Sequence, residues 1–275
     1  MISIITAVHN GLSFNKIFLD YIRRYTQGPY EIIIIDNAST DGSREFFSDN
    51  GCKVIANSRN YSYPYCQNQG IREASGECLF FLNNDIVVSP AWDQRLSRAA
   101  NLQGADIISA AGIENMGNHA ETRSISRRWK RVKNPLGVFG FGENNLRLMH
   151  RMMYGNWQRF CNRRFERFLY NTIEGIVGNN VMMTRRAVSL MDGWDERIQA
   201  ADWDLFMRTK KRSMEAGDIK PCQIALGVYI HHYIRMTVKY AVKPTPFADK
   251  DKLIRLEEKW TGDQIARFHP DNAIS

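Results

Sequence analysis

Two short apolar runs of this chain each lead into a carboxylate. Residues 32–35 are four isoleucines followed by Asp36, which opens the segment Asp-Asn-Ala-Ser-Thr-Asp-Gly, and residues 79–82 lead into Asn83-Asn84-Asp85. A run of this kind that stops at turn-forming residues is typical of a buried parallel strand. In open α/β sheets the ligand lies in the crevice beyond the carboxyl ends of the strands. We therefore expect Asp36 and Asp85 to lie at a ligand-binding edge of a sheet.

Asp85 has the surroundings of a cation ligand. Mg²⁺ and Mn²⁺ prefer oxygen ligands and commonly take one or two carboxylates together with substrate phosphates. Asp85 stands between the apolar runs 79–82 and 86–88, where a carboxylate without a partner is costly. A strand that simply ends in turn residues would explain the same letters, but the apolar neighbours and the motifs below favour a metal.

A further acidic cluster lies in the second half of the chain, where Gly193-Trp194-Asp195-Glu196-Arg197 is followed by Asp202-Trp203-Asp204-Leu205. A carboxylate within hydrogen-bond reach of a hydroxyl can act as a general base. Asp202 could also cap a helix expected over residues 203–210, and capping is compatible with catalysis. For Asp36, a purely structural place in an Asx-turn is the alternative to ligand binding.

The pattern around these residues predicts the elements that hold them. Apolar runs of strand length alternate with segments whose apolar residues recur at helical spacing. The expected strands are 2–8, 32–35, 53–56, 79–82 and 106–111. The expected helices are 14–25, 68–74 and one through Trp92 and Ala99, with another start at 43–47. This alternation favours an α/β fold with a mostly parallel sheet and helices on both faces.

The alternation fails between residues 115 and 167. Residues 144–169 predict one or two helices in which arginines are interleaved with Met, Trp and Phe. Such a stretch could lie in a membrane interface, or its apolar side chains could pack as a helical subdomain or dimer contact, which we favour. Beyond it we expect alternation to resume at 175–183, a short helix at 187–191 and an amphipathic helix at 249–260.

Composition narrows the class of protein. The 275 residues are 44% hydrophobic and 24% charged, values of a globular chain that can bury one large core. A net charge of +8 favours an anionic partner. The five cysteines contain no C-x-x-C pair, which argues against a disulfide framework and a thiolate zinc site. Residues 1–8 are too short to span a bilayer and lack the charged start of a signal peptide, so we expect a cytoplasmic protein.

The order and spacing of these motifs resemble the family 2 glycosyltransferases, enzymes of the GT-A fold that move a sugar from a nucleotide donor. The resemblance covers residues 1–109 and 175–262. On the donor side it implies that Asp36 accepts a hydrogen bond from the base, typically uracil, and that Asn83-Asn84-Asp85 stands for the family's Asp-x-Asp motif, with Asp85 on the metal. The other donor-side residues that it implies as substrate-binding are Ala7, His9, Asn60, Asn68 and Asn84.

On the acceptor side, the family's usual form is Gly-Phe-Asp-Glu and then Glu-Asp-x-Asp, and here Ala201 replaces the second Glu. The resemblance implies that Asp202 is the catalytic base and that Asp204 orients a neighbouring group at the substrate. It also implies that a histidine after the last strand reaches the metal or diphosphate. Because adjacent residues of a strand point to opposite faces, only one of His231 and His232 can do so, and the spacing to Thr237 favours His232.

The combined prediction is a GT-A-like domain for inverting, metal-dependent sugar transfer, with manganese or magnesium as cofactor and a UDP-sugar as the favoured donor. The acceptor would be a glycan or a lipid-linked glycan in surface polysaccharide synthesis, with peripheral membrane contact. The predicted parts are a nucleotide-sugar-binding half (1–112), a basic, partly helical insertion (113–172), and an acceptor-binding half with a C-terminal helix (173–275).

Two rival functions remain. A sugar-nucleotide pyrophosphorylase-like enzyme should carry a Gly-rich, Arg- or Lys-bearing phosphate loop after the first strand, and residues 9–14 lack one. A nucleic-acid-binding protein could use the basic segment, but no recognisable DNA or RNA motif accompanies it, and we expect no nucleic-acid partner.

Overall fold

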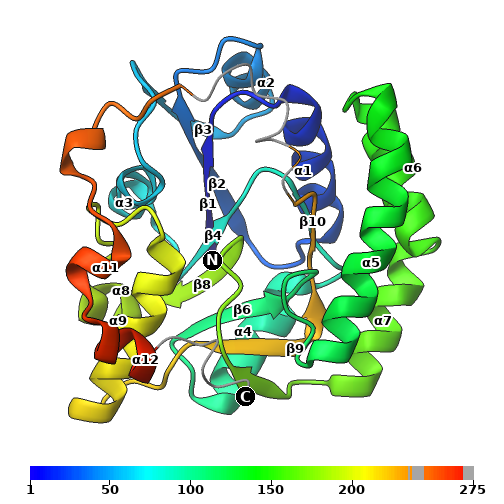
Figure 1. Cartoon of the computed structure of the whole chain (residues 1–275). Coiled ribbons are helices and arrows are strands. Elements are labelled where there is room, and N and C mark those ends of the chain that lie inside the picture. The colour runs from blue at the N-terminus through cyan, green and yellow to red at the C-terminus, as the bar shows by residue number, and fades with distance from the viewer. Residues whose placement is uncertain (235, 237–244, 269–275) are drawn as a thin grey trace.

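The structure, a computed structural model, describes residues 1–234, 236 and 245–268. Its first half alternates strand and helix as expected (Figure 1). Strands β1, β2, β3 and β4 pair in parallel, with β1 between β2 and β4. The elements are β1 (Ile2–Val8), α1 (Leu12–Tyr25), β2 (Tyr30–Asn37), α2 (Ser43–Asp49), β3 (Lys53–Asn57), α3 (Tyr63–Glu73) and β4 (Cys78–Leu82).

The second half extends the same sheet and adds antiparallel pairings. Eight of the described strands form one sheet in the order β3-β2-β1-β4-β8-β6-β9-β7. Strand β8 runs antiparallel to both β4 and β6, β9 pairs in parallel with β6, and β7 is antiparallel to β9. The predicted α/β fold with a mostly parallel sheet is therefore confirmed. The elements are α4 (Trp92–Gln103), β6 (Ile107–Ala111), β7 (Thr172–Glu174), β8 (Asn180–Thr184), α8 (Arg185–Met191), α9 (Ala201–Glu215) and β9 (Gln223–Tyr229).

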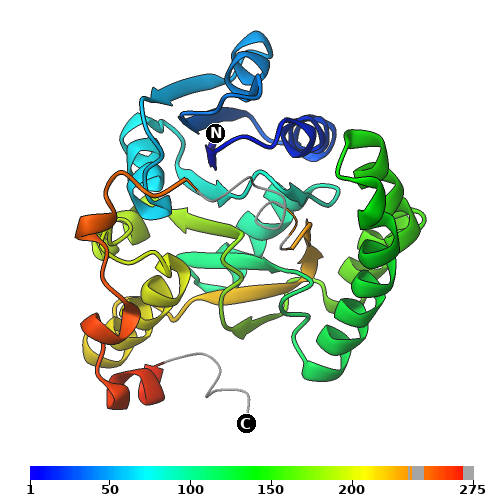
Figure 2. The same ribbon diagram turned by 45° about the horizontal axis from the view of Figure 1, so that its top comes forward.

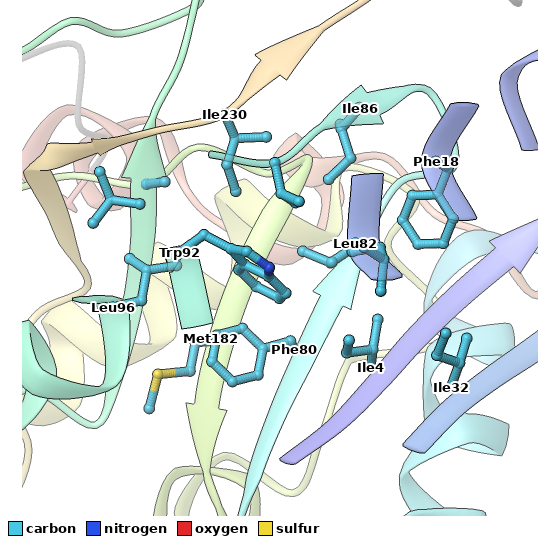
Figure 3. Close-up of a cluster of buried hydrophobic side chains, with 14 of the residues drawn as sticks. Ile4, Phe18, Ile32, Phe80, Leu82, Ile86, Trp92, Leu96, Met182 and Ile230 are labelled. Carbon is cyan, nitrogen blue, oxygen red and sulfur yellow. The ribbon is translucent and has the colours of Figure 1, made fainter. Parts of the chain in front are cut away.

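Two hydrophobic clusters cover the two faces of the sheet. Successive side chains of a strand point to opposite faces, so Ile4 packs with α1, α4 and Phe80 on one face, whereas Ile5 packs with α3, α8 and α9 on the other. Figure 3 shows the first cluster, with Trp92 lying over Phe80. Their rings meet edge to face at 4.9 Å. Burial on both faces is the reason that these strands are continuous apolar runs.

The insertion is a packed helical layer. It consists of α5 (His119–Leu136), the 3₁₀ turn η1 (Gly137–Phe139), α6 (Glu143–Tyr154) and α7 (Trp157–Phe168). Figure 2 shows the three helices together at one side of the sheet. Met149, Met153 and Trp157 are buried in a third hydrophobic cluster. Residues 144–169 thus form two helices that each pack apolar side chains inward, although Leu148, Met152 and Leu169 stay exposed, and this packing favours the subdomain over membrane insertion.

Helix α5 is not among the predicted helices, because Gly, Asn, Arg and aromatic residues dominate residues 116–142. Asn118 provides its start: the side chain accepts a hydrogen bond from the backbone N–H of Glu121, which satisfies one of the N–H groups that a helix leaves unpaired at its beginning. Asn156 caps α7 in the same way. None of the helices in the described part of the chain is both long and apolar enough to cross a membrane.

The predicted single helix over residues 249–260 is wrong. The segment instead consists of η2 (Lys250–Lys252), α11 (Leu256–Lys259) and, beyond it, α12 (Gly262–Phe268). Hydrogen bonds to distant residues hold it: Asp249 accepts from the Ser62 backbone N–H at 2.9 Å, and the Ile254 N–H donates to the Arg197 carbonyl at 2.8 Å. Because the Ile254 N–H bonds to Arg197, it cannot bond to the Lys250 carbonyl as it would in a helix, and the helix is interrupted there.

Candidate active site

Asp36 lies near the C-terminal end of β2, in the interior of the protein. The residue is fully buried, and its Oδ2 accepts hydrogen bonds from Arg44 Nε at 2.9 Å and from the Ser39 backbone N–H at 3.3 Å. Its other oxygen, Oδ1, has no hydrogen-bond partner among the residues that the structure describes. Buried polar atoms are nearly always paired in folded proteins, so Oδ1 is suited to accept an N–H from a ligand.

A pocket of about 400 Å³ near this strand end collects two of the predicted donor-side residues. His9 and Asn60 both line it. The His9 ring lies 2.7 Å from the Asn37 carbonyl, and Asn60 donates to the Thr245 carbonyl at 2.9 Å. Ala7 lies on β1, two residues before His9, and pairs in register with Ile35 of β2.

The Asn68 side chain is hydrogen-bonded to the loop that precedes α9. Its side chain donates to the Trp194 carbonyl at 2.8 Å and accepts from the Trp194 N–H at 3.0 Å. It therefore ties α3 to the loop that precedes α9. Gly70, on the same helix, lies so close to Ile5 that a Cβ there would collide with that side chain, so close packing of α3 on β1 accounts for this glycine.

The predicted metal ligands meet on a small two-stranded ribbon of β5 (Ile86–Val87) and β10 (His231–His232). His232 pairs with Ile86, which places its ring beside Asp85, and its Nε2 lies 3.2 Å from Asp85 Oδ1. The other ring nitrogen, Nδ1, contacts the carboxylate of Glu114. His231 points the other way, into a buried cluster with Trp129 and Tyr154. Thr237, the basis for choosing His232, lies outside the described residues.

Glu114 and Asp85 bracket the His232 ring. Burial by itself would lower the pKa of His232, but the two adjacent carboxylates raise it to about 10. With its ring flanked in this way, His232 holds a proton between Nε2 and Asp85. A divalent ion bound by these two groups would replace that proton, and Glu114 would then orient the ring from behind, as outer carboxylates do for histidine ligands.

The donor set fits Mg²⁺ or Mn²⁺ held partly by the substrate. No three His, Cys, Asp or Glu side chains within the described ranges converge in a metal-binding arrangement. The protein side would therefore be Asp85, an oxygen ligand of the kind that both ions prefer, and the imidazole of His232, which suits the transition metal Mn²⁺ better than Mg²⁺. Such ions commonly complete their shell with diphosphate oxygens and water.

Asp202 lies in the first turn of α9 and faces a cavity that His232 also lines. It lines a cavity of about 360 Å³ together with Asn83, Glu114 and His232. It also lines a neighbouring cavity of about 760 Å³, which includes Trp203 and Glu174. The structure thus brings the predicted base and the predicted metal ligand His232 to one cavity, with a second cavity on the other side of Asp202.

Gly178 leaves room for the Asp202 side chain. A Cβ built at Gly178 would overlap the Asp202 carboxylate and would lie 2.8 Å from its Cβ. We expect Gly178→Ala to displace the carboxylate and to lower the transfer rate at least about tenfold, because a misplacement of about 1 Å can cost 100-fold. Initial rates and the thermal unfolding temperature should be measured together.

Gly142→Ala is a matched control, since a Cβ there meets nothing within 4 Å. An unchanged rate in Gly178→Ala would show that the position of Asp202 does not matter for transfer.

Two other predicted substrate-binding residues are engaged within the protein. Asp204 is fully buried and accepts hydrogen bonds from Arg208 Nε at 2.7 Å and from Trp260 Nε1 at 2.9 Å, besides its ion pair with Lys259. It anchors the C-terminal segment to α9, which leaves no free oxygen for substrate. Asn84 donates to Asn15 at 2.7 Å, toward α1.

Sequence reasoning missed Glu114 and Gly178. Glu114 comes three residues after the end of β6, as Asp85 does after β4, so the same rule about strand ends would have singled it out. Gly178 carries no comparable signal, because its role depends on Asp202, which approaches it from another element.

The fold belongs to the GT-A-like class of α/β proteins. A mannosyltransferase from Pyrobaculum calidifontis, solved with GDP-Man and Mn²⁺, superposes with a TM-score of 0.53 at 12% identity, covering 84% of this chain and 56% of that one. The S. aureus protein TarS (residues 1–349), solved with UDP, superposes with a TM-score of 0.52 at 12% identity, covering 84% and 60%. At this identity the likeness concerns the fold.

Residues 3–191 match the family model described as glycosyl transferase family 2, and the chain belongs to that family. It is 30% identical over 128 residues to the glycosyltransferase AglE of Haloferax volcanii, a match that covers 44% of this chain and 39% of AglE. It is 25% identical over 127 residues to the glycosyltransferase GlyG of Streptococcus pneumoniae, covering 44% and 41%. The matches thus span about two fifths of each of these relatives.

Proposed function

We propose that the protein is an inverting glycosyltransferase that moves a sugar from a nucleotide-sugar donor to a hydroxyl of a glycan or lipid-linked glycan, with the help of a divalent metal. The observation that carries the proposal is the shared cavity of Asp202 and His232, with His232 lying 3.2 Å from Asp85. A base and a group that holds a diphosphate must lie on opposite sides of the transferred sugar, and Asp202 and His232, the residues proposed for these roles, line the same cavity.

In this mechanism Asp202 removes the proton of the acceptor hydroxyl as that oxygen attacks the anomeric carbon. Attack from the side opposite the leaving nucleotide inverts the configuration. A metal bound at Asp85 and His232 would supply Lewis-acid stabilisation of the charge that develops on the leaving diphosphate. Glu114 keeps the His232 ring in place through Nδ1.

On the donor side, Asp36 is the proposed partner of the base. Its buried Oδ1, which has no partner among the described residues, would accept an N–H of the base, and His9 and Asn60 line the adjacent pocket. Uracil presents such an N–H, and we propose a UDP-sugar as donor. The two solved relatives of similar fold hold UDP in one case and GDP-Man with Mn²⁺ in the other.

On the acceptor side, the cavity of about 760 Å³ is the proposed glycan site. Asp202 and Trp203 line it, with Glu174 and Lys210, which form an ion pair at 2.6 Å. An aromatic ring and charged groups side by side suit a sugar, which presents apolar ring faces and hydroxyls. A role in surface polysaccharide synthesis is consistent with such an acceptor.

Contact with the inner face of a membrane is part of the proposal, at a different place from residues 144–169. Val138 and Phe139 in η1 are each 77% exposed. They follow directly on α5, whose exposed side carries Arg127, Lys130 and Arg131. An apolar tip beside basic side chains suits an anionic lipid surface, where a lipid-linked acceptor would be presented.

The proposed function is tested by thermal unfolding in the presence of UDP-, GDP- and dTDP-sugars, each with and without Mn²⁺. We expect a UDP-sugar to raise the unfolding temperature in the presence of Mn²⁺, since a ligand at 100 times its Kd stabilises the folded state by about 2.7 kcal/mol. The sugar that binds can then be offered with glycan acceptors, and NMR of the product anomer tests inversion. Failure of every nucleotide sugar to shift the transition would contradict the proposal.

A further inference from the structure

A groove of about 700 Å³ runs between α5 and α7, away from the candidate active site. None of its described lining residues lines either of the two cavities at Asp202. The first turns of α5 separate the two regions: Asn118 and Thr122 face the larger cavity, whereas Ser124 and Arg128 face the groove. The groove is therefore separate from the two cavities at Asp202.

The side chains that line the groove are strongly cationic. Five arginines and a single acidic residue, Glu121, are among the described lining residues; the arginines are Arg128, Arg159, Arg163, Arg164 and Arg167. Glu121 is shared by two of them, at 3.6 Å from Arg164 and 3.0 Å from Arg167. For Arg128, Arg159 and Arg163, the described part of the chain supplies no ion pair. The groove thus gathers five positive charges against one negative charge.

Arg164 is the most informative of these residues. Only 7% of its side chain is exposed, and one guanidinium nitrogen donates to the Met116 carbonyl at 2.9 Å. Its Nε has no hydrogen-bond partner in the described ranges. Burial lowers the pKa of the Arg164 guanidinium. A buried cation that shares its only carboxylate and has an unused donor is incompletely compensated, and buried charges are normally paired.

Aromatic surface lies beside these charges. The Arg164 and Arg167 guanidinium groups each lie 4.7 Å from the centre of the Phe168 ring. Phe160 also lines the groove, and Asn156, which caps α7, places the positive end of that helix dipole at the same site. Planar guanidinium groups match phosphate oxygens with paired hydrogen bonds.

We propose that the groove between α5 and α7 is a second binding site, which holds the phosphate or diphosphate group of a ligand that also carries an apolar part. The arginines bind the phosphate, and Phe160 and Phe168 contact the apolar part. The site is separate from sugar transfer. Its ligand is either a soluble phosphate ester or the phosphate headgroup of a lipid, and the experiment distinguishes the two.

The test compares two double variants of the full chain that remove equal charge. Arg159→Gln with Arg163→Gln changes the groove, whereas the control variant, Arg123→Gln with Arg151→Gln, changes exposed arginines of α5 and α6 that do not line it. Titration calorimetry with inorganic diphosphate, in EDTA and about 0.15 M salt, should show binding at least about tenfold weaker in the groove variant. Binding in the control variant should stay within about twofold of wild type.

The unfolding temperature of both variants should match wild type, and so should their Mn²⁺-dependent binding of a nucleotide sugar, which separates this proposal from that of the enzyme. Octyl phosphate below its micelle concentration should bind more tightly than inorganic phosphate; equal affinity would remove the apolar part of the proposal. Equal loss of diphosphate binding in both variants would show diffuse charge only and would overturn the site.

Vesicles of phosphatidylcholine with phosphatidic acid identify the source of the phosphate. Sedimentation with vesicles that is lost in the groove variant alone assigns a lipid headgroup. If diphosphate binding is weakened in the groove variant and no variant binds vesicles, the ligand is a soluble phosphate ester. Absence of binding to all of these probes in the wild-type protein would overturn the proposal.

Discussion

Asp202→Asn is expected to lower the rate of sugar transfer at least about 100-fold while donor binding stays unchanged. The amide has nearly the same size and can still occupy the space beside Gly178, but it cannot take a proton from the acceptor hydroxyl. General-base catalysis typically contributes 100- to 10,000-fold. The measurements are the initial rate at saturating donor and the donor Kd in the presence of Mn²⁺.

Asp263→Asn serves as a control for Asp202→Asn, since Asp263 is an exposed acid of α12 in the same half of the chain. Near-normal transfer in Asp202→Asn would reject Asp202 as the base. A parallel fall in donor affinity would instead place Asp202 among the donor-binding groups.

Asp85→Ala is expected to abolish the part of donor binding that depends on the metal. Asp85 is 5% exposed and lies on one side of the His232 ring, so its removal leaves a single proposed protein ligand, His232. Loss of a residue that merely supports a metal ligand costs about 10- to 100-fold in affinity or activity, and loss of a ligand itself should cost at least as much. Calorimetric titration of the UDP-sugar with and without Mn²⁺ measures the effect.

The unfolding temperature without ligand must be recorded for the Asp85 variant, because the change also leaves His232 with Glu114 alone. Asp85→Asn, which keeps the shape of the side chain, is the second variant. Asp20→Asn is the control, since Asp20 forms ion pairs with Arg24 and Arg147 that are partly exposed to solvent and do not involve His232. Equal donor affinity in wild type and both Asp85 variants would reject Asp85 as a metal ligand.

The strands within residues 1–112 were predictable because their signal is local. A strand buried on both faces must be apolar along its whole length, and the chain must turn where it leaves the sheet, so residues 32–35 and 79–82 could be recognised together with the acids that follow them. The predicted placing of Asp36 and Asp85 at strand ends followed from this. The identity of Asp202 and His232 as site residues came from the resemblance to a family, since an isolated Asp or His has no distinguishing pattern.

Other features depended on contacts between residues far apart in the chain. Glu114 meets His232 across 118 positions, and Asp204 meets Trp260 across 56. Asp204 could be taken for a substrate ligand, and residues 249–260 for one helix, because nothing near them in the sequence reveals these partners. By itself the sequence determined which segments enter the sheet and where acids follow them, since burial and turn formation act locally. Only the tertiary structure decided which of those polar groups face a cavity and which form hydrogen bonds or ion pairs with one another, because that depends on how distant elements pack.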